Sequence, residues 1–167
     1  MIELGNFQQY QTYFSAIASD HKELDATNPY LFGDEEVGNN KIRSWGTGKK
    51  LWLEPPQPAR MLDGNSDNLQ LERPSSFTIC GAAGSKKFQD EYDFYKECEG
   101  IVIDIIARMR KDYSDSTLKV LIDFPSMRLN WVELTLGGTK LIGCRLDFSF
   151  RDPSGFPYTE AKWKSED

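Results

Sequence analysis

Residues 86–113 carry the longest helical pattern in this sequence, and that pattern constrains the fold more than any other feature. Apolar side chains recur along it at spacings of three and four, which places them on one side of an α-helix. Acidic residues occupy its first turns and basic residues its last, as the helix dipole favours. The apolar side consists of Phe88, Tyr92, Tyr95, Val102, Ile106 and Met109, widened by Phe94, Cys98, Ile101 and Ile105. We expect one long helix that lies across a sheet.

Strand patterns precede this helix along the chain. Apolar runs at 50–54, 69–72 and 76–80 indicate extended segments, and a polar tip, 63–68, lies just before the second of them. Pro74 is expected to separate or bulge the last two, because proline donates no hydrogen bond to a strand ladder.

Further strands are expected after the helix. Residues 118–124 form one, which Pro125 stops, and residues 129–136 form the next. Two glycines at 137–138 predict a hairpin turn into the strand 142–150, where apolar and polar or small residues alternate. One face of this last strand should lie in the core, and the other should be wet or at an interface.

A short amphipathic helix is expected near the N-terminus. Asn6 and Gln9 have the spacing of a capping box, and the helix should end near residue 19 or 20. A long irregular connection then covers residues 20–48, with residues 30–32 packed onto the core. The apolar side of the helix is formed by Phe7, Tyr10, Phe14 and Ile17.

This order of elements predicts an α+β fold. Strands without regular helical crossovers favour a mostly antiparallel sheet, with the long helix (about 86–113) across one face and a short N-terminal helix. We expect a single domain over residues 1–152, followed by a polar tail over residues 153–167.

Composition excludes several classes of function. The 20 Lys and Arg residues against 26 Asp and Glu residues give a net charge of −6, so an overall basic surface for nucleic acid is absent. No stretch approaches the roughly 20 apolar residues of a membrane span. The N-terminus lacks the basic and apolar regions of a secretory signal.

Cysteine and histidine content limits the chemistry further. The three cysteines, an odd number without a CxxC pair, predict free buried thiols instead of a disulfide framework. A single histidine, His21, excludes a histidine-rich zinc site and is expected at the surface. The cysteines are Cys80, Cys98 and Cys144.

Two segments imitate ligand-binding motifs without completing them. Residues 63–67 match the start of a calcium loop, but Asn68 and Pro74 stand where glycine and glutamate are required. A polar turn is the favoured interpretation, and ion binding at 63–68 stays open. Residues 81–87 lie between a strand and a helix but lack the P-loop spacing, so they predict a flexible junction.

The acidic residues predict solvated surface and ordinary helix pairing. Residues 34–36 form an acidic loop with no partner cluster of metal ligands. Asp104 is expected to face outward beside Arg108, four residues later. We assign no catalytic, cofactor-binding or metal-ligating residue.

Aromatic residues supply the candidate contacts. Trp131, within a strand, is expected in the core, whereas Trp45 and Trp163 lie in segments typical of contact anchors. Folding back onto their own domain is the alternative for these loop aromatics. The candidate interface residues are Trp45, Trp52, Phe156, Tyr158 and Trp163.

This layout resembles that of phage neck and tail-completion proteins of the tail-terminator type. The resemblance spans about residues 5–152 and rests on element order, without a signature motif. It is carried by the N-terminal helix, the strand 51–54, the tip 63–68, the strand 77–80, the helix 90–113 and the ending 143–150.

The resemblance implies a structural virion protein and not an enzyme. It implies a homo-oligomeric ring at the head–tail junction, with other neck or tail proteins as partners and DNA only as passing cargo. Neither a cofactor nor a membrane is expected, and the location would be the virion, after synthesis in the host cytoplasm. The alternative is a small cytosolic α+β enzyme or a monomeric binding domain.

Overall fold

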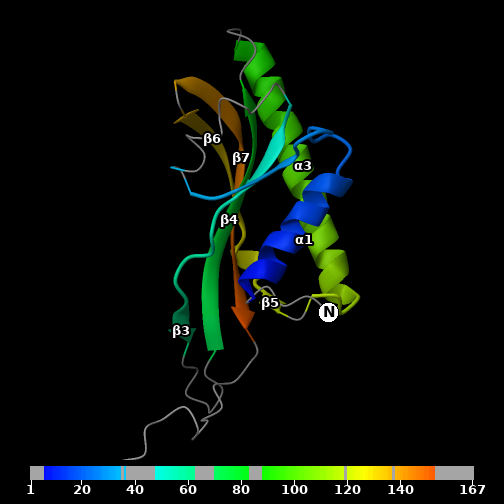
Figure 1. Ribbon diagram of the computed structural model, residues 1–167, viewed down its shortest axis with the longest axis vertical. Coiled ribbons are helices and arrows are strands. Elements are labelled where there is room, and N and C mark those ends of the chain that lie inside the picture. Colours follow the sequence, from blue (N-terminus) through cyan, green and yellow to red (C-terminus); the bar gives the residue numbers. More distant parts are fainter. Residues whose placement is uncertain are drawn as a thin grey trace, which may run out of the picture.

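The computed structural model describes residues 6–34, 36, 48–62, 70–82, 88–118, 120–136 and 138–152. Figure 1 shows the described helices beside a curved sheet. The helices are α1 (Phe7–Asp20) and α3 (Phe88–Ser114), and a 3-10 turn spans Phe124–Ser126. The strands are β1 (Tyr30–Phe32), β2 (Lys50–Leu53), β3 (Arg60–Leu62), β4 (Gln70–Ala82), β5 (Leu121–Ile122), β6 (Arg128–Leu136) and β7 (Thr139–Asp152).

The sheet is built around two long strands, β4 and β7. They pair antiparallel from Leu71 opposite Asp152 to Ala82 opposite Leu141. The strand order is β1-β2-β4-β7-β5, with β3 also on β4 and β6 also on β7. Among the described strands only β1 and β2 pair in parallel, so the predicted α+β fold with a mostly antiparallel sheet is confirmed.

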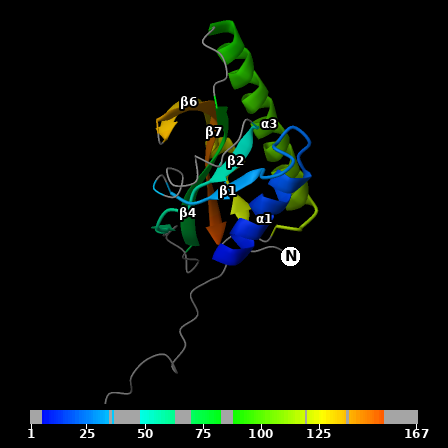
Figure 2. The same cartoon turned by 45° about the horizontal axis from the view of Figure 1, so that its top comes forward.

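Both helices cover the same face of this sheet (Figures 1 and 2). Alternate residues of β4 and β7 point toward them, and the aromatic rings of α1 fill the centre. The core includes Tyr10, Phe14 and Ile17 from α1, Cys98, Ile101, Val102, Ile105 and Met109 from α3, and Phe77, Ile79, Cys144, Leu146, Phe148 and Phe150 from the sheet. The periodicity of the sequence therefore identified most of the buried side of each helix, although Tyr92 of the predicted apolar side of α3 is 39% exposed.

The N-terminal cap of α1 forms as predicted. The side-chain oxygen of Asn6 accepts a hydrogen bond from the backbone N–H of Gln9 at 3.1 Å. The helix ends at Asp20, within the predicted boundary. Phe7 is the exception on the predicted apolar side, because it is 53% exposed and touches only the edge of the core through Phe32.

The predicted break at Pro74 is wrong, since β4 runs continuously through it. The backbone N–H of Gln57 donates to the carbonyl oxygen of Pro74 at 2.9 Å, on the side of β4 away from β7. In a strand the N–H and C=O of one residue point to the same side, so the missing N–H falls between β3 and β2. The ladder with β7 therefore loses nothing at this proline.

Other boundaries also differ from expectation. The strand predicted over 118–124 is reduced to β5, and Pro125 lies inside a 3-10 turn that follows it. Residues 30–32 form a true strand instead of merely packing on the core. The junction predicted at 81–87 begins later, because residues 81 and 82 still belong to β4.

A close approach of β4 and β7 requires glycine at position 143. A Cβ atom there would lie 2.0 Å from the carbonyl oxygen of Ile79 and 2.7 Å from the Cα of Cys80. These are backbone atoms, so no side chain can turn away to relieve the clash. By contrast, a Cβ at Gly100 of α3 would meet open space, so that glycine marks no close contact. Neither described helix combines the length and apolar composition that crossing a bilayer requires.

Candidate functional site

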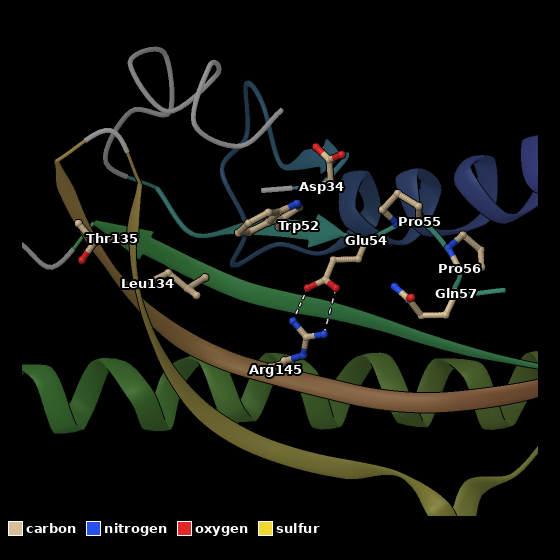
Figure 3. A pocket seen from close by; sticks show the side chains of 9 residues that line it. All are labelled: Asp34, Trp52, Glu54, Pro55, Pro56, Gln57, Leu134, Thr135 and Arg145. Atoms are coloured by element: carbon tan, nitrogen blue, oxygen red, sulfur yellow. Dashed lines mark hydrogen bonds and ion pairs between the residues drawn. The ribbon is translucent and has the colours of Figure 1, made fainter. Parts of the chain in front are cut away.

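A groove of about 380 Å³ lies on the face of the sheet turned away from α3 (Figure 3). One wall comes from β2 and the segment after it, and the other from the turn end of β6. Arg145 projects from β7 into the groove between these walls. The lining residues are Asp34, Trp52, Glu54, Pro55, Pro56, Gln57, Leu134, Thr135 and Arg145.

Arg145 is held in the groove by a network of acceptors. Its guanidinium group makes a two-point contact with the carboxylate of Glu54, in which Nη2 lies 3.0 Å from Oε2 and Nη1 contacts Oε1. Nη2 also donates to the hydroxyl of Ser76 at 2.9 Å, and Nε donates to Asp147 at 2.8 Å. The hydroxyl of Ser76 in turn donates to Glu54 at 2.9 Å. This network ties β2, β4 and β7 together across the face that the helices leave open.

Trp52 forms the apolar side of the groove. It is only 4% exposed, and its indole N–H donates to the carbonyl oxygen of Gly33 at 2.7 Å. Leu31, Cys80 and Leu141 pack with it in a second buried cluster, separate from the helix-side core. Because so little of Trp52 is exposed, this candidate interface residue can contribute only a small area to a contact. Its role in an interface stays a prediction.

A second polar cluster fastens α1 to α3. The hydroxyl of Tyr13 donates to Asp112 at 3.0 Å, and Nε of Arg108 donates to both oxygens of the same carboxylate. Burial, and then the charge of Asp112, raise the pKa of the Tyr13 hydroxyl well above its usual value. Asp112 itself is 7% exposed. A phenol and a guanidinium thus satisfy a buried carboxylate, which is a structural arrangement.

The predicted pairing of Asp104 with Arg108 is wrong. Asp104 does face outward, but its carboxylate lies 3.6 Å from Nε2 of His21 at the end of α1. Arg108 turns instead to Asp112, one helical turn further on, and to Asp20. His21 is partly covered, with 16% of its side chain exposed, because the chain turns there to leave the helix.

Trp131 is not a core residue, contrary to expectation. Its side chain is 41% exposed on β6, on the same face as α3. The ring stacks on Tyr95 with 5.0 Å between centroids and meets the edge of Tyr92 at 5.3 Å. Its indole N–H donates to Glu99 at 2.8 Å, and the ammonium of Lys96 lies 5.5 Å from the ring centre. We call Trp131, Tyr92 and Tyr95 the aromatic patch.

β6, which contributes Trp131 to this patch, is an edge strand. Its nine residues pair with β7 on one side, and no strand of the described residues pairs with it on the other. Antiparallel pairing to one neighbour uses the backbone groups of every second residue. The remaining N–H and C=O groups of β6 therefore face outward, next to the aromatic patch.

The cysteines behave as the sequence predicted. All three are free and buried. Burial raises the pKa of Cys98 and Cys144 to about 12, which keeps both thiols protonated at neutral pH. Among the described residues, no group of three or more His, Cys, Asp or Glu side chains is arranged to hold a metal ion.

Much of the predicted contact set lies outside the described residues. Trp45, Phe156, Tyr158 and Trp163 belong there, as does the polar tip 63–68. The pairing of Arg145 with Glu54 was missed, because the two are 91 positions apart and only the alternation of β7 marked Arg145 as facing away from the core.

Known proteins offer no counterpart with which these contacts can be compared. Family models, curated proteins and solved structures all fail to match the chain. The groove around Arg145, the cluster around Asp112 and the outer edge of β6 are thus the features from which a function is argued.

Proposed function

We propose that this chain is an architectural subunit that joins copies of itself into a ring. The supporting observation is the outer edge of β6, nine residues long with no partner strand among the described residues. Soluble proteins usually shorten, charge or cover such an edge, because its free backbone groups recruit another strand. An edge that is long and also carries an exposed tryptophan fits a strand-addition contact.

The sheet has unlike edges at β1 and β6, which fits a ring better than a two-fold pair. The edge on the β1 side is only three residues long, and Phe32 within it contacts Phe7 of α1. The β6 edge is three times as long and contributes Trp131 to the aromatic patch. Contacts between unlike surfaces repeat head to tail, and they close into a ring when the rotation between subunits allows it.

We further propose that this ring is a neck or tail-terminator-like component of a tailed phage or prophage virion. The support is the order of elements that resembles this type of protein, of which the α+β fold is one part. The net charge of −6 also suits a conduit, because phosphates pass an acidic wall without binding. On this proposal the other neck and tail proteins are its partners, and DNA is only cargo.

The size of the purified protein tests this proposal. Light scattering coupled to size exclusion, followed by negative-stain microscopy, should detect closed rings formed alone or on addition of virion particles. Mass spectrometry of assembled particles should find the chain in stoichiometric amounts. A concentration-independent monomer that is absent from particles contradicts the proposal.

The groove around Arg145 favours a second candidate, a monomeric binding domain. Its volume and its mixture of Trp52, Leu134 and charged groups suit a small polar ligand or a peptide. A ligand found there by mass spectrometry of the native protein, together with a monomeric mass, would favour this candidate over the ring.

A further inference from the structure

We propose that the C-terminal tail of a second copy of this chain, residues 153–167, adds to the outer edge of β6 and packs Trp163 against the aromatic patch. This inference rests on the proposed ring, since it names the segment and the surface that join neighbouring subunits. Repeated from copy to copy in one direction, this contact would link the subunits head to tail, as the proposed ring requires.

The β6 edge supplies both hydrogen bonds and an anchor point. The backbone groups that face away from β7 can pair with an added strand, while the aromatic patch lies beside them on the helix side. Stacking on Tyr95 and the hydrogen bond to Glu99 hold the Trp131 ring before any partner arrives. Because the Trp131 side chain is already fixed, it loses little conformational entropy on binding.

Charge around the patch indicates what the added strand should carry. The carboxylates of Glu91, Glu99 and Glu133 lie near it, against the ammonium groups of Lys96 and Lys140. Together these five groups carry a net charge of −1. An added strand that placed a carboxylate on this side would be repelled, so the residues that face the patch should be uncharged.

The tail has this composition. Trp163 stands between Lys162 and Lys164, and the stretch 159–164 alternates Thr, Ala and Trp with Glu, Lys and Lys. In an added strand this alternation would place Trp163 on one face and both lysines on the other. Fifteen residues follow Asp152, a length that spans up to about 50 Å when extended.

The position of β5 favours a second copy over the chain's own tail. β7 ends at Asp152, and this end lies opposite its turn with β6 (Figure 1). On the β6 side of that end, β5 already pairs with β7 at Phe150 and Arg151. β5 thus stands between the end of β7 and the β6 edge of the same chain, whereas a neighbouring copy could approach that edge from outside.

Disulfide trapping between full-length chains tests the contact. One variant carries Thr135→Cys, an exposed position on β6, and the other carries Ala161→Cys together with a mass tag. The native cysteines are all buried and should not interfere. The matched control replaces Thr135→Cys with Ser19→Cys, which is exposed on α1.

Mild oxidation of the mixture should yield a covalent pair of unlike chains, several-fold more abundant than with the Ser19→Cys control. Adding Trp163→Ala to the tail variant should reduce the yield, whereas adding Glu166→Gln should not. Equal yields from β6 and control positions overturn the inference. A third variant that carries both Thr135→Cys and Ala161→Cys completes the test, and cross-linking that appears only within single chains of this variant also overturns the inference.

The oligomeric state of the same samples separates this inference from the proposed ring. Rings without preferential trapping mean that another surface joins the subunits, so the inference fails and the proposed function stands. Preferential trapping in a protein that never closes into rings supports the tail contact and contradicts the proposed ring.

Discussion

The sheet face beneath α1 and α3 is held by apolar packing, whereas the opposite face is held around Arg145 by charged groups. On the helix side, rings from α1 meet Phe77 and Phe148 with centroids 5.6–5.9 Å apart. On the other side, Arg145 bridges Glu54, Ser76 and Asp147. Burial of apolar area stabilises more than polar pairs of this kind, but polar pairs fix geometry. Apolar packing on the helix side is therefore expected to supply most of the stability, whereas the Arg145 network links neighbouring segments on the other face.

The largest expected effect is on the helix side, with Phe14→Ala. Phe14 is fully buried between Tyr10, Phe77 and Phe148, so its removal leaves a cavity and should cost about 3–5 kcal/mol of unfolding free energy. Urea denaturation measures this. Phe7→Ala on the same helix is the control, because Phe7 is 53% exposed and should cost well under about 1 kcal/mol. Similar costs for the two would show that α1 is not anchored by its buried side.

A smaller effect is expected on the opposite face, with Arg145→Ala. This change leaves the carboxylates of Glu54 and Asp147 without their donor and should cost about 1–3 kcal/mol. Arg145→Lys should recover only part of it, since an ammonium group cannot make the two-point contact. A loss as large as that of Phe14→Ala in the same denaturation assay would reverse the comparison between the faces.

A substitution at Gly100 of α3 should raise stability, in contrast to the losses expected at Phe14 and Arg145. Gly100→Ala adds a Cβ into open space within a helix, so stability should rise by about 0.5–1 kcal/mol. Thermal unfolding measures the gain. Gly143→Ala is the contrasting variant, because its Cβ would strike the backbone of β4, and it should lower the melting temperature. A loss of stability in Gly100→Ala would show that α3 is strained near its midpoint.

The smallest effect concerns pH at the aromatic patch. The indole N–H of Trp131, and then Lys96, hold the pKa of Glu99 below its usual value. A carboxyl group with a lowered folded-state pKa stabilises the fold at pH values above its unfolded pKa, and this contribution is lost as pH falls through the folded pKa. NMR titration should show the pKa of Glu99 rising in Trp131→Phe. An unchanged pKa would mean that Lys96 alone determines it.

Local pattern was enough to predict the helices, the β6–β7 hairpin, the Asn6 cap and the α+β class. Each of these depends on side chains within a few residues of one another, so spacing along the chain carries the physical information. The free buried cysteines followed in the same way from their apolar neighbours. None of these predictions required knowledge of which strands are neighbours.

The tertiary structure decided what depends on distant partners. Glu54 lies 91 positions from Arg145, and Trp131 lies 32 positions from Glu99, so neither pair leaves a periodic signal. Pro74 does not interrupt β4. The side of β4 on which its backbone N–H is missing faces the segment between β2 and β3, and not a paired strand. Trp131 is exposed because β6 lies at the edge of the sheet, and strand order is a property of the assembled sheet. Sequence periodicity determines which side of an element is apolar, whereas long-range pairing determines whether that side is covered.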